Sequence, residues 1–186
     1  MKIAIGTDHR GRDMLRHISQ FLRVRQHELI DLSPTCNHSV DYPDVAYDVA
    51  KRVSRGQVDR GILLCGSGIG MAIAANKVRD IRAALVYDEI SAEMSRRHND
   101  ANILCLPSEL VGRRLIDRVV EIFLQTDFEG GRHTRRIHKI SQIERNENAE
   151  IITAAMQVKP AQPVAASASP PKEPAAAKLQ MRPAQH

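Results

Sequence analysis

The sequence is poor in aromatic residues and in cysteine. Its 186 residues include no tryptophan, three tyrosines, three phenylalanines and three cysteines. An odd number of cysteines at wide spacings (Cys36, Cys65 and Cys105) supplies neither a disulfide framework nor a zinc-ligand pattern. We therefore expect reduced thiols and no metal site.

Long hydrophobic runs and a signal sequence are also absent. No window reaches the roughly 18 uninterrupted apolar residues that a membrane helix needs, and Met1 leads directly into a strand-like run. We expect a cytoplasmic protein with no membrane partner. The formal charge is +5, but only 3% of the residues are aromatic, and none are interleaved with the basic residues as a stacking platform. This balance argues against a nucleic-acid partner and fits an anionic small molecule.

The composition divides the chain into two parts. At 42% hydrophobic and 26% charged residues, the sequence as a whole is that of an ordinary globular protein. From about Ala154 onward, however, it holds six of the nine prolines and almost no large apolar residue. We predict one folded domain over residues 1–148 and a disordered Ala/Pro/Lys-rich tail over residues 149–186.

Strand-like and helix-like patterns alternate along the folded part. We predict an α/β fold whose parallel sheet is covered by helices on both faces. Asp44 is expected to cap the second helix and Gly56 to stop it. The predicted strands cover 2–7, 28–33, 60–65, 82–87 and 102–106, and the predicted helices cover 11–25, 44–55, 68–77, 90–97, 111–125 and 132–146.

In such a sheet, ligands bind beyond the carboxyl ends of the strands. The candidate residues are then Asp8 and His9 after the first strand, the segment 65–70 after the third, Asp88 after the fourth, and 107–109 after the fifth.

The segment after the third strand, "CGSGIG", carries the most specific signal. Gly66, Gly68 and Gly70 allow a sharp turn that aims several amides, and the start of the next helix, at one point, which suits an oxyanion or phosphate. Cys65 at its edge could then act as a base or nucleophile. The alternative is that the cysteine is only a buried residue and that the glycines allow close packing of helix on strand.

Three familiar phosphate-binding patterns do not fit this loop. A dinucleotide fingerprint needs a third glycine or an alanine where Met71 or Ile73 stands. A P-loop needs Gly-Lys-Ser/Thr, which is absent, and a cysteine-phosphatase loop needs an arginine at Met71. Asp88 does stand where a ribose-binding acid would be, but the fingerprint failure outweighs it.

Four other polar clusters stand out. "GTDHRG" holds Asp8 and His9, "SVDYPD" holds Asp41 and Tyr42, "RRHND" holds His98 and Asn99, and "EGGRHTRRIHK" opens the last helix. In that helix Arg132 and Arg136 are four residues apart, share a face and could grip one dianion. Taken singly, each cluster also has an ordinary explanation, such as a helix C-terminal cation or a solvated face.

Together, "GTDHRG", "VDYPD", "CGSGIGMAIAANK", "SRRHNDANIL" and "EGGRHTRRI" resemble, in order and spacing, the ribose-5-phosphate isomerase B group of sugar-phosphate isomerases, which includes the galactose-6-phosphate isomerase subunits. The resemblance covers Met1 to about Glu147. It implies a Rossmann-like three-layer sandwich with a five-stranded parallel sheet. It also implies aldose–ketose isomerisation of a sugar phosphate without metal or organic cofactor.

The resemblance further implies a role for each site residue. Cys65 would move a proton between C1 and C2 through a cis-enediol(ate), and the amides of 66–70 with Ser67 would hold the oxyanion. His98 would help to open the furanose ring, with Asp8 assisting proton transfer. The substrate-binding set would be His9, Asp41, Tyr42, Gly66, Gly68, Gly70, Asn99, Arg132 and Arg136.

The same resemblance implies assembly and draws attention to two departures. In the family the site lies between two subunits, which implies a homodimer or homotetramer with His98 and Asn99 supplied by the neighbouring chain. Ser67 stands in place of a more usual threonine and keeps its hydroxyl. Glu109 stands where relatives usually carry a phosphate-binding arginine, so a phosphate would be repelled unless Arg113 or Arg114 compensates.

Ribose 5-phosphate is therefore the expected substrate, and two kinds of alternative stay open. One is an isomerase for a tetrose or hexose phosphate. The other is a protein without isomerase activity, either a sugar-phosphate-binding protein or a thiol redox sensor. The lack of an obvious resolving cysteine disfavours the redox sensor.

Overall fold

The structure is a computed structural model that describes residues 1–35 and 39–145. The predicted tail over 149–186, the end of the last predicted helix at 146, and Cys36 lie outside the described residues. Among the residues described, no helix combines the length and the apolar character needed to cross a bilayer.

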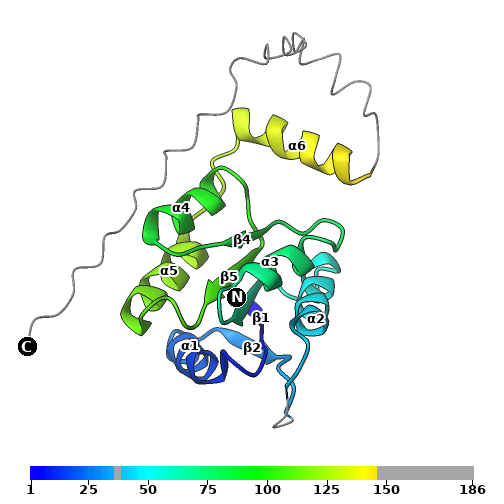
Figure 1. Ribbon diagram of the computed structural model, residues 1–186. Coiled ribbons are helices and arrows are strands. Elements are labelled where there is room, and N and C mark those ends of the chain that lie inside the picture. The colour runs from blue at the N-terminus through cyan, green and yellow to red at the C-terminus, as the bar shows by residue number, and fades with distance from the viewer. Residues whose placement is uncertain (36–38, 146–186) are drawn as a thin grey trace, which may run out of the picture. The chain divides into compact units, whose positions relative to one another are not determined.

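A five-stranded, all-parallel sheet forms the centre of the fold (Figure 1). Its order is β2-β1-β3-β5-β4, and every neighbouring pair runs in the same direction. The central strands are almost continuously apolar and buried, as expected for a sheet covered on both faces. The strands are β1 (Lys2–Thr7), β2 (Glu28–Asp31), β3 (Arg60–Cys65), β4 (Ala83–Leu85) and β5 (Ile103–Pro107).

Helices cover both faces of the sheet, so the predicted α/β three-layer sandwich is confirmed (Figure 1). One face packs against α1 (Arg12–Val24), α4 (Glu89–Arg97) and α5 (Arg113–Gln125). The other packs against α2 (Tyr42–Ser54) and α3 (Ile69–Ala75).

Successive side chains along each strand point to opposite faces of the sheet, so each strand contributes to the core on both sides. On β3, Ile62 and Leu64 face the layer of α1, α4 and α5, whereas Leu63 and Cys65 face the layer of α2 and α3. The period of two therefore places the side chain of Cys65 on the α2/α3 side of the sheet.

The last helix, α6 (Arg132–Glu144), contributes no residue to either core cluster. Two of its contacts with the rest of the fold involve specific side-chain groups. The His133 ring stacks on His98, and Glu144 accepts a hydrogen bond from the backbone N–H of Asp80 at 2.9 Å. Ile140 and Ile143 of this helix are exposed.

Most predicted boundaries differ from the structure by one or two residues. The α2 helix begins at Tyr42, with Asp41 rather than Asp44 at its N-cap, because Pro43 fits the first turn of a helix, where no backbone N–H is needed. The β4 strand covers only Ala83–Leu85 of the predicted 82–87, since the chain turns away after Val86 toward the Asp88 cap of α4. Gly56, with φ +65°, lies just past the end of α2 as expected.

Candidate active site

A cavity of about 370 Å³ lies at the carboxyl ends of β1 and β3. The chain leaves β1 toward β2 on one side, while β3 lies on the other side of β1. This reversal of strand order is the place where open α/β sheets bind ligands. The cavity is lined by Asp8, His9, Arg10, Tyr42, Cys65, Gly66, Ser67, Gly70, Glu109 and Leu110.

Cys65 is the last residue of β3 and, among the described residues, the only cysteine that lines this cavity. It is 6% exposed, and its Sγ accepts a hydrogen bond from the backbone N–H of Gly68 at 3.1 Å. Such a hydrogen bond is stronger when the acceptor is an anion. The loop thus offers a donor to a thiolate at the point where the cavity meets the sheet.

Hydrogen bonds from other parts of the chain fix three carbonyl groups of the loop. The Cys65 carbonyl accepts from both the N–H and the Oγ of Ser108, at 2.9 and 3.0 Å, and the Gly66 carbonyl accepts from the N–H of Glu109 at 3.2 Å. The Ser67 carbonyl accepts from the hydroxyl of Tyr87 at 3.1 Å. Because C=O and N–H point in opposite directions across a trans peptide, the next three amides face away from these anchors. The Gly68 amide is the one that reaches Sγ.

Two of the loop glycines are required by space, and one of them, Gly68, by backbone conformation as well. Gly68 has φ +77°, and a Cβ there would lie 2.5 Å from Leu85 Cδ1 and 3.1 Å from the backbone of Leu106. A Cβ on Gly70 would lie 2.6 Å from the ring of Tyr42. Close packing therefore explains the glycines at both positions, against the strands at Gly68 and against α2 at Gly70, and an amide of the same loop is directed at the thiol.

The residues after β1 form the other wall. Asp8 is buried, and its Oδ1 accepts a hydrogen bond from the backbone N–H of Arg10 at 2.9 Å. His9 is exposed, with Nδ1 3.5 Å from the Oγ of Ser39. Asp41 is exposed at the N-cap of α2 and does not line the cavity, whereas its neighbour Tyr42 does.

Sequence reasoning did not single out Arg10, which also lines the cavity. Its Nη1 lies 3.3 Å from Oε2 of Glu109, the residue whose negative charge drew attention in the sequence. The sequence suggests Arg113 or Arg114 as the compensating cation, but the described ion pair of Glu109 is with Arg10, which follows Asp8 and His9 in the chain. The signal in the sequence is that Arg10 directly follows the candidate residues Asp8 and His9 in "DHRG".

The remaining predicted residues gather elsewhere in the same chain. His98 is the C-cap of α4 and stacks on His133, with ring centroids 4.3 Å apart and planes 3° from parallel. Glu129 Oε2 lies 3.9 Å from His98 Nε2. The structure therefore separates the predicted site into a cavity group and a second group around α4 and α6. The second group consists of His98, Asn99, Arg132 and Arg136, none of which lines the cavity.

Charges shape this second group. His133 is 3% exposed, and its burial, followed by the nearby His98 and Arg132, lowers its pKa. The hydrogen bond from Arg97 lowers the pKa of Glu129. Arg132 and Arg136 are exposed in the first turns of α6.

One set of side chains could in principle hold a metal ion. His98, Glu129 and His133 each offer a ligand atom, all within 4.8 Å of one another. Glu129 is already engaged, because its Oε2 lies 2.9 Å from Nη2 of Arg97. Ion pairing therefore accounts for its position without a metal.

Asp88, which the sequence left open as a ribose-binding acid, has a structural role. Its carboxylate accepts a hydrogen bond from the N–H of Ser91 at 2.8 Å and caps α4. This hydrogen bond lowers the pKa of Asp88.

A buried thiol beside a loop amide, in a cavity at the switch point of a parallel sheet, is an arrangement suited to proton transfer or nucleophilic attack next to an anion. Comparison with known proteins makes this chemistry specific. Residues 3–140 match the family model described as Ribose/Galactose Isomerase. The chain belongs to this family of sugar-phosphate aldose–ketose isomerases.

Three curated relatives illustrate the range of the family. The putative sugar phosphate isomerase YwlF of Bacillus subtilis is 49% identical over 145 residues, which cover 77% of this chain and 97% of that one. Ribose-5-phosphate isomerase B of Escherichia coli is 43% identical, with 79% and 99% covered. The D-erythrulose-4-phosphate isomerase of Pectobacterium atrosepticum is 39% identical, with 79% and 97% covered.

Solved structures agree with the fold. Ribose-5-phosphate isomerase B of Clostridium thermocellum has a TM-score of 0.77 and 49% identity, over 78% of this chain and 99% of that one. The Mycoplasma genitalium enzyme, solved with bound ribulose 5-phosphate, has a TM-score of 0.75 and 43% identity, over 77% and 96%. The Rossmann-like sandwich and the isomerase class expected from the sequence are thus confirmed.

Proposed function

We propose that the protein interconverts ribose 5-phosphate and ribulose 5-phosphate, with Cys65 as the base. The observation that carries this proposal is the position of Cys65: its Sγ lies at the cavity wall and accepts a hydrogen bond from the amide of Gly68. The relatives support the substrate class, and ribulose 5-phosphate is bound in one of them.

The proposed chemistry is a proton transfer between neighbouring carbons. The thiolate of Cys65 takes the proton from C2 of the open-chain aldose, and the C1–C2 bond gains double-bond character as negative charge moves to O1. The amides of the loop stabilise this cis-enediolate. A proton passes from O2 to O1, with Asp8 assisting, and the Cys65 thiol returns its proton to C1 to give the ketose.

We propose that the second group acts on the substrate of a neighbouring subunit. His98 of the partner subunit would open the furanose ring, and Asn99 of the partner subunit would bind the sugar. Arg132 and Arg136 would bind the phosphate together with His9, and Tyr42 and Asp41 would contact the sugar. This division accounts for the absence of His98, Asn99, Arg132 and Arg136 from the cavity of their own chain.

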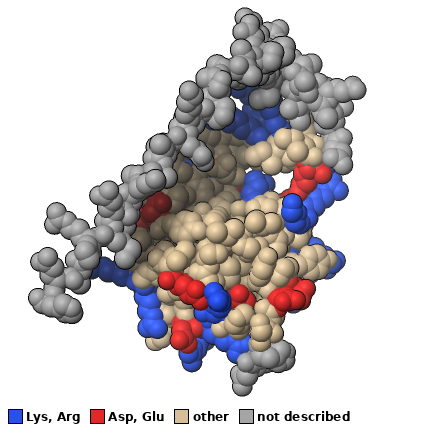
Figure 2. All heavy atoms as spheres, in the orientation of Figure 1, with Lys and Arg blue, Asp and Glu red and all other residues tan. Residues whose placement is uncertain are grey.

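The surface beside the cavity supports a homodimer, or a homotetramer made of two dimers. Ile69 and Ile73 on α3 are 48% and 59% exposed, a short distance along the chain from the cysteine loop. Figure 2 shows few charged side chains in the region where Figure 1 places α3 and β4. A second copy of the chain packed on this face would bury these side chains and bring its own α4 and α6 toward the cavity.

The second candidate is an isomerase for a tetrose or hexose phosphate. Glu109 favours it, because an acid at the cavity wall changes the charge that the phosphate meets. The relative that acts on D-erythrulose 4-phosphate supports the tetrose version of this candidate. A sugar-phosphate-binding protein without catalysis is the third possibility.

Turnover separates these candidates. Purified protein is assayed with ribose 5-phosphate, erythrose 4-phosphate and a hexose 6-phosphate, beside Cys65→Ala and the matched control Cys105→Ala, which alters a fully buried thiol on the same sheet face. We expect ribose 5-phosphate to give the highest kcat/KM, and Cys65→Ala to lower it about 10³-fold.

Each other result supports a different candidate. A higher kcat/KM for the tetrose or hexose phosphate would change the proposed substrate but not the proposed type of reaction. Binding without turnover of any sugar phosphate would support the binding protein. Equal activities of Cys65→Ala and Cys105→Ala would contradict the assignment of the base.

A further inference from the structure

The turn that carries His98 and Asn99 ends in an unusual backbone conformation. The α4 helix ends at Arg97, His98 is its C-cap, and Asp100 has φ +44°. This left-handed region is uncommon for residues other than glycine, although aspartate tolerates it better than most. The conformation of the turn therefore depends on contacts from outside it.

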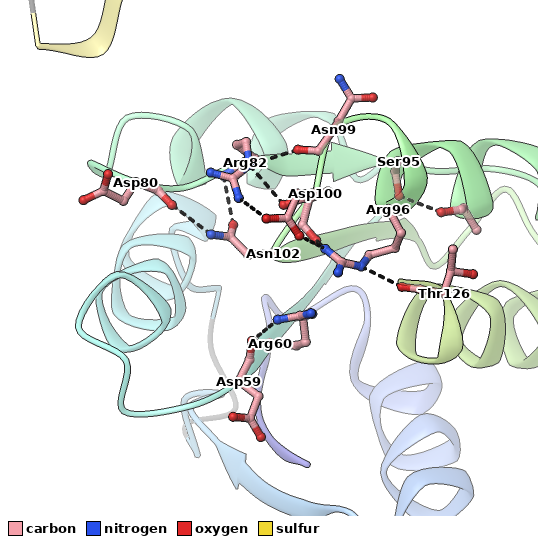
Figure 3. Close-up of polar contacts among 12 residues, drawn as sticks. Asp59, Arg60, Asp80, Arg82, Ser95, Arg96, Asn99, Asp100, Asn102 and Thr126 are labelled. Atoms are coloured by element: carbon pink, nitrogen blue, oxygen red, sulfur yellow. Dashed lines mark hydrogen bonds and ion pairs between the residues drawn. The ribbon is translucent and has the colours of Figure 1, made fainter. Parts of the chain in front are cut away.

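The carboxylate of Asp100 lies between two arginines. Its Oδ2 is 2.9 Å from Nη2 of Arg82, and its Oδ1 is 2.8 Å from Nη1 of Arg96 (Figure 3). Arg82 directly precedes β4 and Arg96 lies in the last turn of α4, so one side chain joins two parts of the fold.

Arg82 also holds the backbone of the turn directly. Its Nε donates to the carbonyl oxygens of Asn99 and Asp100, at 2.9 and 3.0 Å. Figure 3 shows the Asn99 carbonyl turned toward Arg82 while its side-chain amide points away from the cluster. The backbone of Asn99 is thus fixed, while its exposed side-chain amide has no hydrogen bond to any of the described residues.

Arg96 anchors the turn to the core. It is 3% exposed, and its Nη1 donates to the Ala101 carbonyl at 2.6 Å as well as to Asp100. Its Nε donates to the Thr126 carbonyl at 3.2 Å, and its guanidinium lies 5.7 Å from the centre of the buried Phe123 ring. A buried arginine with this many acceptors has one geometry available to it.

A third arginine, Arg60, lies near the charges of this cluster. Burial, followed by the nearby Arg96, lowers the pKa of Arg60, while Asp100 acts in the opposite direction. Arg60 Nε is buried and has no hydrogen-bond partner among the described residues. Loss of the Asp100 carboxylate would leave three neighbouring guanidinium groups with less compensation.

We propose that Arg82, Arg96 and Asp100 are positioning residues that fix His98 and Asn99 in the orientation needed at the substrate. This inference rests on the proposed function, in which those two residues act on a sugar phosphate held by a neighbouring subunit. A displacement of about 1 Å at a catalytic group lowers rates by up to about 100-fold, so rigid support of the turn has a direct effect on turnover.

The test is a double-mutant cycle between Arg82 and His98. Arg82→Lys keeps a charge but loses the Nε donor, and it avoids the buried Arg96. We expect Arg82→Lys to lower kcat on ribose 5-phosphate about 10- to 100-fold, with KM changed less than about threefold. In a His98→Gln background, the same substitution should lower kcat less than about twofold, because the group that it positions is already gone.

Two further variants complete the design. Asp100→Asn keeps tolerance for the left-handed conformation and the size of the side chain, but lacks the charge, and we expect it to behave as Arg82→Lys does. The matched control is Arg118→Lys, at an exposed pair with Glu89 and Glu121, which should leave kcat unchanged. Thermal unfolding of each variant identifies any that fails to fold.

The outcomes are distinct. If Arg82→Lys lowers kcat by the same factor with and without His98, the effect is general and the positioning role is wrong. If Arg82→Lys and Asp100→Asn both keep full activity, the role is also wrong. No turnover by the unsubstituted chain would instead contradict the proposed function, and the positioning role with it.

Discussion

The cavity group and the second group, called the His98 group below, are held in place by different kinds of interaction. Around Cys65, backbone hydrogen bonds fix the loop, and glycines allow it to pack against Leu85 and Tyr42. Around His98, side chains fix the turn through a histidine stack and the ion pairs of Asp100. The cavity group is thus fixed by the backbone at the end of the sheet, and the group around His98 is fixed by side-chain contacts and ion pairs.

This difference has consequences for how each half responds to change. Backbone geometry is insensitive to pH and salt but tolerates no added volume. Ion pairs and histidine stacks tolerate volume more readily but depend on charge state. Substitutions that add atoms should therefore damage the cavity group most, and changes in charge should damage the His98 group most.

The largest effect is expected from Gly68→Ala. A Cβ at position 68 would lie 2.5 Å from Leu85 Cδ1, and the alanine backbone would have to adopt φ +77°. We expect the free energy of unfolding to fall by about 2–4 kcal/mol, and turnover to fall with it because the amide that faces Cys65 moves. Chemical denaturation and kcat measure the two effects.

Gly56→Ala is the matched control. Gly56 has φ +65° but no atom within 4 Å of the added Cβ, so it shares the strain and lacks the collision. We expect a loss of about 1 kcal/mol and unchanged kcat. If the two alanine variants proved equally stable and equally active, packing would not be what fixes the loop.

A smaller effect is expected from Glu109→Gln at the cavity wall. Removal of a negative charge near a bound phosphate should lower KM for a sugar phosphate about 3- to 10-fold and leave kcat within twofold. The Arg10 ion pair, with both side chains about half exposed, contributes little to folding, so stability should change by less than about 1 kcal/mol. Steady-state kinetics at two salt concentrations measures the change.

Glu28→Gln serves as its control, since Glu28 pairs with Lys2 at the start of β2, away from the carboxyl ends of the strands. Its KM should match that of the unsubstituted chain. A rise in KM in Glu109→Gln would show that Glu109 binds the substrate rather than repelling its phosphate.

The smallest effect is expected from pH at the histidine stack. Because the pKa of His133 is lowered in the folded chain, the unfolded chain takes up this proton first as the pH falls. The stability that His133 contributes is full above about pH 6.5 and is lost as the pH falls through the folded-state pKa. His133→Phe keeps a flat ring without a titrating group.

We therefore expect the difference in unfolding free energy between the unsubstituted chain and His133→Phe to shrink between pH 7.5 and about 5.5. His138→Gln, which alters an exposed histidine of the same helix, should show no such change. A difference that stays constant with pH would mean that His133 does not titrate in this range.

Most of the fold could be predicted from the sequence because its signals are local. Alternating apolar runs placed five strands and six helices, and misplaced only ends such as the start of α2, where Pro43 fits the first helical turn. The cavity group was also local, since Cys65 and its glycines stand together after a buried strand.

The anchors of the His98 group could not be predicted. Arg82, Arg96 and Asp100 are separated by up to 18 residues, and their side chains meet only after β4 and β5 pair. The Arg10–Glu109 pair spans 99 residues in the same way. Charged residues at these positions also suit a solvated surface, so only the folded arrangement distinguishes the two.

The central claim is that one active site combines Cys65 of one chain with His98 of another. The most direct test is complementation between Cys65→Ala and His98→Gln, coexpressed with different tags so that the mixed dimer is purified. Each homodimer should be nearly inactive. A mixed dimer has one site with both substitutions and one with neither, so we predict about half of the unsubstituted turnover. Activity no higher than that of the two homodimers would contradict the shared site.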